Sequence, residues 1–412
     1  MLKHKITDMY DFDEIIDRNG SGCVKTDALR SRFGRTDLTP MWIADMDFRA
    51  PDFITDALKE RVGHPVFGYT MVPDDYFPTI SAWIKSLHGW EVGPESIRYV
   101  PGIVKGIALV LDCFYNPADK VLIQPPVYHP FRIVSGNLGH EVVTSPLIPV
   151  YGEDGFLSTY RMDFDGLERC FDNDPAIRVM ILSNPHNPGG IAWDRESLER
   201  LADLAEKYNV LVISDEIHSE MILRGGTHIP FASVSESAMR HSITFQAPSK
   251  TFNIAGIVSS YAIVPDPELR SRFFGFLDAC ELSSPSIFSI TATMAAYRNG
   301  RQWRDEMLAY VQGNIDFVDG WLKENLPCIG CVMPDASFLV WLDCRKLGLS
   351  QDRLVDLFVN GAGLALNDGS IFGKEGEGFM RMNVGCPRSV IKDALESLRK
   401  AITAVCNTGN RL

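Results

Sequence analysis

Three clusters of polar residues each follow a short apolar run of strand-like composition. They occupy 183–190, 215–218 and 247–253, directly after the apolar runs 179–182, 210–214 and 243–246. The clusters supply an amide in Asn187, a carboxylate in Asp215 and an amine in Lys250. Because the carboxyl ends of parallel strands meet at one edge of a sheet, we expect these three side chains to share one site.

An amide, a carboxylate and an amine are the groups that pyridoxal phosphate chemistry needs. The aldehyde of that cofactor requires a lysine, its ring nitrogen requires a carboxylate that keeps it protonated, and its phenolic oxygen requires a hydrogen-bond donor. Taken singly, each residue has an ordinary explanation: a helix cap for Asp215, a turn for Asn187 and a solvated charge for Lys250. Their order at three successive strand ends favours the cofactor site.

The surrounding pattern predicts the elements that would position these groups. Apolar, β-branched runs lie at 121–124, 141–147, 179–182, 210–214, 243–246 and 261–264. The spacing of leucines in 195–209 predicts a helix between two of these runs. Apolar runs without polar alternation are typical of a mostly parallel sheet covered by helices, so we predict an α/β fold.

The pattern changes near residue 300, where longer helical segments surround a strand-like run at 338–342. We therefore predict two units. The larger, cofactor-binding unit covers 50–295, and a smaller α+β unit combines 296–412 with the N-terminal segment 1–49.

Composition restricts the class of protein. The chain has 412 residues, is 45% hydrophobic and 23% charged, and carries a net charge of −13. Such a charge disfavours nucleic acid and anionic membranes as partners, although a local basic pocket for a small anion stays open. The apolar runs are too short to span a bilayer, no apolar secretion signal begins the chain, and nine scattered cysteines are typical of reduced thiols. We predict a cytoplasmic globular protein.

The motifs in and around these clusters resemble a known family. NPHNPGG, SDEIH and SKTFNIAG, in this order, resemble the class I/II aminotransferase superfamily of fold-type I pyridoxal-phosphate enzymes. Five flanking motifs resemble the MalY/PatB type of cystathionine β-lyase: PMWIADMDF (40–48), VFGYT (66–70), PPVYHPF (125–131), NDGSIFG (367–373) and FMRMNVGCPR (379–388). The resemblance implies pyridoxal 5′-phosphate as the cofactor. It also implies a large domain with a seven-stranded, mostly parallel sheet between helices, and a smaller C-terminal domain.

The resemblance implies a role for each residue around the cofactor ring. Lys250 would bind the cofactor aldehyde and then, as a free amine, remove the proton from the substrate Cα. Asp215 would pair with the ring nitrogen, and Asn187 would bond the phenolic oxygen. Tyr128 would stack on the ring, although a half-buried core tyrosine is its ordinary explanation.

The phosphate of the cofactor would bind at the start of a helix. The backbone amides of Gly102, Ile103 and Val104 would face it, with Ser249 as a further contact. The ordinary explanations are a turn at Gly102 and a helix cap at Ser249. Tyr69 matches a tyrosine that reaches the phosphate in the neighbouring subunit, so the resemblance implies a homodimer.

Two positions depart from the aminotransferase pattern. His218 stands where aminotransferases often have a tyrosine that bonds the phenolic oxygen, and we place it among the cofactor contacts. Val258 stands where some aminotransferases have a phosphate-binding arginine.

An arginine is expected for substrate binding, because a guanidinium holds an α-carboxylate through two hydrogen bonds. Arg381 matches the carboxylate-binding arginine of the family and is preferred over Arg388. Trp42 and its neighbours to residue 47 would line the substrate entrance, with the backbone at Ala44 as a second contact for the carboxylate.

The leading hypothesis is a C–S β-lyase that converts L-cystathionine or L-cysteine-type S-conjugates to a thiol, pyruvate and ammonia. The alternative is an aminotransferase of the same superfamily, since Lys250 can serve both reactions. A hydrolase with a metal held by Asp215, Glu216, His218 and His186 is disfavoured, because adjacent residues of an extended chain point to opposite sides. We therefore expect no metal. An additional regulatory role stays open.

Overall fold

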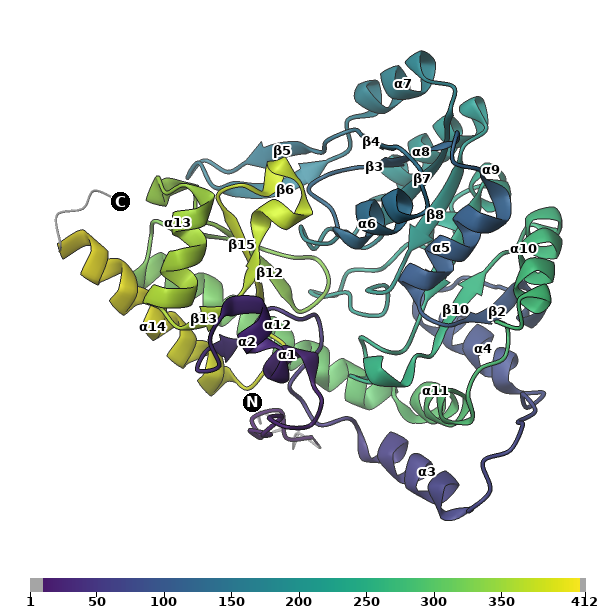
Figure 1. The fold of residues 1–412 in the computed structure, drawn as a ribbon, viewed down its shortest axis with the longest axis horizontal. Coiled ribbons are helices and arrows are strands. Elements are labelled where there is room, and N and C mark those ends of the chain that lie inside the picture. Colours follow the sequence, from purple (N-terminus) through teal and green to yellow (C-terminus); the bar gives the residue numbers. More distant parts are fainter. Residues whose placement is uncertain (1–9, 408–412) are drawn as a thin grey trace, which may run out of the picture.

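A seven-stranded sheet forms the centre of the larger part of the molecule (Figure 1). The structure is a computed structural model that describes residues 10–407. In spatial order the strands are β2 (Ile97–Val100), β10 (Ser260–Ile263), β9 (Ser242–Gln246), β8 (Leu211–Asp215), β7 (Ile177–Ser183), β3 (Lys120–Ile123) and β4 (Val142–Thr144). Strand β10 is antiparallel to both of its neighbours, and the other pairs are parallel. The predicted α/β class is confirmed.

The sheet differs in detail from the expected strands. The edge strand β2 is absent from the predicted set, and β4 is shorter than the predicted run 141–147. Because β10 is antiparallel to both β2 and β9, strand β2 runs parallel to β9. The carboxyl ends of β2, β3, β7, β8 and β9 therefore lie at the same edge.

Helices cover both faces of this sheet because its strands are apolar on both faces. In β7, Val179 and Ile181 pack with one core cluster, which includes residues of α5 (Ile103–Phe114), α6 (Pro130–Asn137) and α10 (Pro267–Ala279). The alternate residues Met180 and Leu182 pack with a second cluster, which includes residues of α7 (Phe164–Asn173), α8 (Arg195–Tyr208) and α9 (Glu236–Arg240). Helix α8 confirms the helix predicted over 195–209. Its N-terminus is capped by the Asp194 carboxylate, which accepts from the Ser197 N–H at 2.7 Å.

A smaller antiparallel sheet lies beside the large one (Figure 1). Its strands are β11 (Gly330–Val332), β12 (Leu339–Asp343), β15 (Phe379–Asn383) and β14 (Asn367–Asp368). Its core contains side chains from the long helices α12 (Arg301–Asn325) and α14 (Arg388–Asn407), and also from α4 (Tyr76–His88) and α11 (Ile287–Asn299) of the larger part. The two parts therefore share one continuous core, and the exact domain boundaries stay a prediction.

The N-terminal part of the described chain contributes one strand to a separate two-stranded sheet. Helices α1 (Val24–Asp27) and α2 (Leu29–Phe33) precede β1 (Thr39–Pro40), which pairs with β13 (Leu364–Ala365). The irregular segment 42–48 then leads to α3 (Asp52–Gly63). The remaining α-helices and β-strands are the hairpin β5 (Ile148–Tyr151) and β6 (Leu157–Arg161), and helix α13 (Gln351–Asp356).

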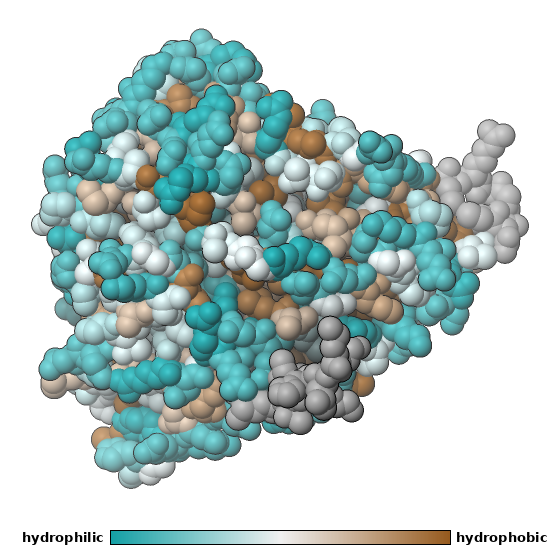
Figure 2. Space-filling model, turned by 180° about the vertical axis from the view of Figure 1, so that it is seen from behind, coloured by the Kyte–Doolittle hydropathy of each residue, from teal (hydrophilic) through white to brown (hydrophobic). Residues whose placement is uncertain are grey.

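The surface mixes hydrophilic and apolar residues. Figure 2 shows one face on which hydrophilic residues predominate, with apolar residues in small patches nearer the middle. Within residues 10–407, none of the helices has the length and apolar character needed to cross a bilayer.

Candidate active site

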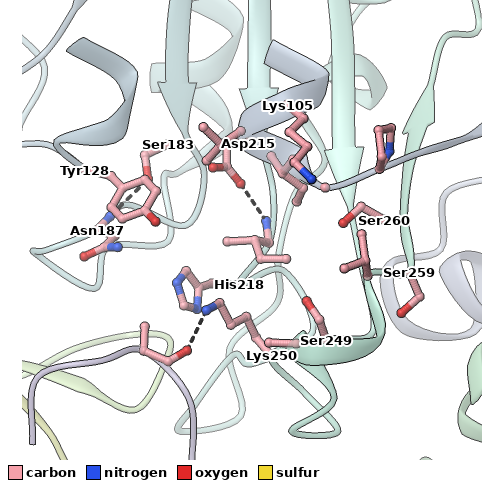
Figure 3. A pocket seen from close by; sticks show the side chains of 18 residues that line it. Lys105, Tyr128, Ser183, Asn187, Asp215, His218, Ser249, Lys250, Ser259 and Ser260 are labelled. Atoms are coloured by element: carbon pink, nitrogen blue, oxygen red, sulfur yellow. Dashed lines mark hydrogen bonds between the residues drawn. The ribbon is translucent and has the colours of Figure 1, made fainter. Parts of the chain in front are cut away.

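A cavity of about 320 Å³ opens at the carboxyl edge of the large sheet (Figure 3). Its volume lies in the range of small-molecule sites. The residues that line it are Ala44, Pro101, Gly102, Ile103, Val104, Lys105, Tyr128, Ser183, Asn187, Asp215, Ile217, His218, Ser249, Lys250, Ala255, Val258, Ser259 and Ser260. The cavity thus brings together most of the site residues predicted from the sequence.

Asp215 ends strand β8 and is buried. One carboxylate oxygen accepts from the Ile217 N–H at 3.1 Å, and the residue forms no ion pair within the described part of the chain. Burial raises the pKa of the Asp215 carboxyl to about 7, although the Ile217 N–H and the Lys250 charge lower it. A buried carboxylate of this kind is stabilised by a cationic ligand group.

Lys250 lies in the turn after strand β9 and points into the cavity (Figure 3). Its Nζ donates to the main-chain oxygen of Ala44 at 2.5 Å. Burial lowers the pKa of the Lys250 amine to about 8, and the nearby Asp45 carboxylate opposes this shift. The neutral form that a nucleophile or a base requires is therefore far more populated near pH 7 than in a lysine exposed to water, although the charged form still predominates.

Asn187 follows strand β7 and is oriented by two neighbours. Its backbone N–H donates to Ser183 Oγ at 3.1 Å, and its Oδ1 accepts from Arg381 at 2.9 Å. Because Arg381 occupies the amide oxygen, the NH₂ group of Asn187 is left to donate to a ligand.

His218 and Tyr128 complete the walls around the centre of the cavity. Burial, followed by the charges of Lys250 and Arg381, lowers the pKa of His218 to about 3, so its imidazole is neutral. Its Nδ1 is buried with no hydrogen-bond partner. Tyr128 packs edge-on against Phe131, and burial raises the pKa of its phenol. Its ring borders the cavity on the side of Asn187 (Figure 3).

Arg381 lies on strand β15 and is buried. Besides Asn187, its guanidinium donates to Asn367 Oδ1 at 2.6 Å and to the Trp42 carbonyl at 3.2 Å. It also lies 4.8 Å from the centre of the Phe372 ring, and its Nε has no partner. Burial lowers the pKa of Arg381 to about 10, so the group stays cationic at neutral pH.

The other end of the cavity is suited to an anion. Gly102 has a φ of 115°, a conformation open to glycine, and it precedes the first turn of α5 at Ile103. The free N–H groups of a helix N-terminus attract anions. Ser249, Ser259 and Ser260 face the same space, and the buried Ser259 hydroxyl has no hydrogen-bond partner.

Three predicted residues, Trp42, Tyr69 and Arg381, do not line this cavity. The Trp42 indole is buried against Phe33, and its Nε1–H donates to the Lys25 carbonyl, so Trp42 contributes only its own carbonyl, to Arg381. Tyr69 is fully exposed in the segment between α3 and α4. Arg381 reaches the cavity only through its hydrogen bond to Asn187. Arg388, the alternative to Arg381, binds Asn314 Oδ1 through Nε at 3.0 Å.

Several residues of the site were not predicted. Lys105 lines the anion-binding end, Ser183 orients Asn187, and Asn367 holds Arg381. Lys105 could have been found from its place one residue after the predicted backbone contacts. The partners of Asn187 and Arg381 depend on packing between distant strands, which spacing does not reveal.

The residues fit pyridoxal phosphate. An unpaired buried carboxylate at Asp215 suits a protonated ring nitrogen, and the free amide NH₂ of Asn187 suits the phenolic oxygen. Lys250 lies in the same cavity for the aldehyde, and the amides before α5 suit the phosphate. For the metal alternative, residues 10–407 contain no group of three or more histidine, cysteine, aspartate or glutamate side chains placed to hold an ion. Glu216 points away from the cavity to His228, at 2.8 Å.

Fold and site together define the class of protein. The chain belongs to the aminotransferase class I and II family, whose family model matches residues 45–398.

Relatives within this family cover nearly the whole chain. Cystathionine beta-lyase PatB of Bacillus subtilis is 41% identical over 95% of this chain and 100% of its own. Protein MalY of Escherichia coli is 32% identical over 96% of this chain and 100% of its own. Among solved structures, cystalysin from Treponema denticola, which contains pyridoxal 5′-phosphate, has a TM-score of 0.91 and 30% identity over 96% of this chain and 100% of its own.

Proposed function

We propose that this protein is a pyridoxal-phosphate-dependent C–S β-lyase. It would cleave L-cystathionine or related L-cysteine S-conjugates to a thiol, pyruvate and ammonia. The observation that carries the proposal is that Lys250 and the unpaired carboxylate of Asp215 line one cavity. Arg381 contacts Asn187 of the same cavity and keeps an unpartnered Nε for the substrate carboxylate. The relative named cystathionine beta-lyase PatB supports the choice of reaction, and the pyridoxal 5′-phosphate in cystalysin supports the choice of cofactor.

The chain's own residues perform four tasks. The bound cofactor supplies an electron sink for the substrate Cα. Asp215 would hold the ring nitrogen in its protonated form, and Arg381 would orient the substrate through its carboxylate. Lys250 would act as the base that takes the proton from the substrate Cα, since burial lowers the pKa of its amine to about 8. The neutral imidazole of His218 would contact the cofactor without adding a positive charge to the site.

Product analysis tests this function against transamination. With L-cystathionine, the lyase releases homocysteine and pyruvate in equal amounts without a 2-oxo acid. An aminotransferase instead converts the cofactor to its pyridoxamine form and needs a 2-oxo acid for further turnover. If the cofactor-loaded protein releases neither thiol nor pyruvate from L-cystathionine, the lyase assignment is refuted.

Lys105 is expected to contribute to binding of the cofactor phosphate. It lines the anion-binding end of the cavity, where Val258 supplies no charge. Lys105 is exposed, so water would screen an ion pair between its amine and the cofactor phosphate, and the effect of losing it should be modest. We expect Lys105→Met to weaken pyridoxal phosphate binding about three- to tenfold.

Pyridoxal, which lacks the phosphate, provides the control for this prediction. Its affinity, measured by absorbance titration of the cofactor-free protein, should be the same in wild type and Lys105→Met. An equal loss of affinity for both compounds would show that Lys105 does not act on the phosphate.

We also propose a homodimer in which Tyr69 reaches the neighbouring site. In support, the segment that follows α3 exposes several apolar side chains, among them Val66, Phe67, Tyr69 and Met71. Such a run is costly to leave in water and is typical of an interface. Light scattering should give twice the chain mass of 46.0 kDa, and a monomer with full activity would contradict the proposal. A cytoplasmic location stays a prediction.

A further inference from the structure

The irregular segment 42–48 contacts Lys250 and Arg381 through its backbone carbonyls. The Ala44 carbonyl accepts from Lys250 Nζ at 2.5 Å, a contact drawn in Figure 3. The Trp42 carbonyl accepts from Arg381 at 3.2 Å. A carbonyl that accepts one N–H of a neutral amine fixes the direction of that amine and leaves its lone pair free. The position of this segment therefore determines where the free amine of Lys250 lies.

Two cations from the N-terminal part of the chain hold this segment. Arg18 binds both carboxylate oxygens of Asp45 at 3.0 Å and one oxygen of Asp47 at 2.6 Å. Lys25 binds the other oxygen of Asp47 at 2.7 Å and the Asp45 carbonyl at 3.2 Å. Lys25 is only 1% exposed, and a lysine is rarely buried so completely unless it is paired.

Two asparagines tie the same segment to the chain around Lys250 and Arg381. Asn253, three residues after Lys250, donates to the Met46 and Phe48 carbonyls at 2.8 Å. Asn383, two residues after Arg381, donates to the Ile43 and Asp45 carbonyls at 2.6 Å. The segment is thus fixed on the active-site side by amides and on the outer side by Lys25 and Arg18.

We propose that Lys25 and Arg18 are positioning residues for proton removal. Through Asp45 and Asp47 they hold the Ala44 carbonyl where it receives the amine of Lys250 after the substrate has displaced that amine. The proposal rests on the proposed function only in its first chemical step, removal of the Cα proton, which lyases and aminotransferases share.

The proposal separates two properties of the protein. Cofactor binding depends on Asp215, Asn187 and the anion-binding end of the cavity, and Lys25 contacts none of these. Proton removal depends on the placement of the Lys250 amine, and a displacement of about 1 Å can slow a reaction about 100-fold. Loss of Lys25 should therefore slow proton removal and leave the cofactor bound.

Exchange of the Cα hydrogen of L-alanine in D₂O, followed by NMR, measures this step directly. L-Alanine has no leaving group at Cβ, so elimination does not interfere. We expect the cofactor-loaded Lys25→Met and Arg18→Met variants to exchange at least about tenfold more slowly than wild type. The control Arg49→Met removes an exposed ion pair to Glu14 beside the same segment and should stay within twofold.

Cofactor content from absorbance is measured on the same samples. Exchange within twofold of wild type in Lys25→Met would overturn the proposal, as would a loss that only parallels loss of bound cofactor. If Lys25→Met does not fold, Arg18→Met decides the matter, because Arg18 is partly exposed and Lys25 still pairs with Asp47. A wild type that exchanges Cα hydrogen but yields no thiol would refute the lyase and leave this inference standing.

Discussion

Replacing Lys250 with alanine should reduce turnover of L-cystathionine by at least about 10³-fold. The variant loses both the amine that binds the cofactor aldehyde and the base that removes the Cα proton, and a positioned base alone contributes about 10²- to 10⁴-fold. Asp215 and the backbone before α5 remain, so the variant should still bind pyridoxal phosphate without a covalent bond. Release of pyruvate and the absorbance of dialysed protein measure the two effects.

An exposed lysine gives the matched control for this variant. Lys59 on α3 pairs with Asp56 at 2.8 Å on the surface, and Lys59→Ala should keep wild-type turnover. A Lys250→Ala variant with more than a tenth of wild-type activity would show that another residue supplies the amine.

Replacing Asp215 with asparagine should lower turnover about 10²- to 10³-fold, the effect typical of losing a buried electrostatic contact to a reacting group. Asparagine keeps the shape of the side chain but cannot hold the ring nitrogen in its protonated form. In the wild type without cofactor, the pKa of Asp215 is raised to about 7, so the carboxyl is largely protonated below that pH. A protonated ring nitrogen would lower this pKa, because it adds a positive charge beside the carboxylate.

The pH dependence of cofactor binding provides a second measurement on the same variant. Because the bound cofactor lowers the pKa of Asp215, the affinity of wild type for pyridoxal phosphate should rise as the pH increases through about 7. Asp215→Asn should lose this contribution to the pH dependence. The exposed Asp203 on α8 supplies the control Asp203→Asn, which should behave as wild type. Equal turnover in Asp215→Asn and wild type would exclude the assigned role.

Much of the cavity could be predicted because its residues follow parallel strands. The carboxyl ends of β7, β8 and β9 position Asn187, Asp215 and Lys250. Buried parallel strands can be recognised in a sequence as apolar runs. The same rule places Gly102 after β2, although β2 itself was not predicted. This strand is short, lies at the edge and is interrupted by the charged Arg98, so its apolar signal is weak.

Contacts made by the N-terminal segment could not be predicted. The hydrophobicity of Trp42 is compatible with either a substrate entrance or a core position, and packing against Phe33 settles its orientation. Nothing in the sequence around Lys25 distinguishes it from a surface lysine. In the structure its side chain is buried and forms ion pairs with Asp45 and Asp47. Such pairings arise from segments that meet only in the folded chain.

Borohydride reduction of the purified, cofactor-loaded protein followed by peptide mass analysis tests most directly whether the amine at 250 carries the cofactor. We predict loss of the visible absorbance band and a single pyridoxyl-phosphate adduct on the peptide that contains Lys250. A colourless protein that takes up no cofactor, or an adduct on a different lysine, would contradict the proposed chemistry.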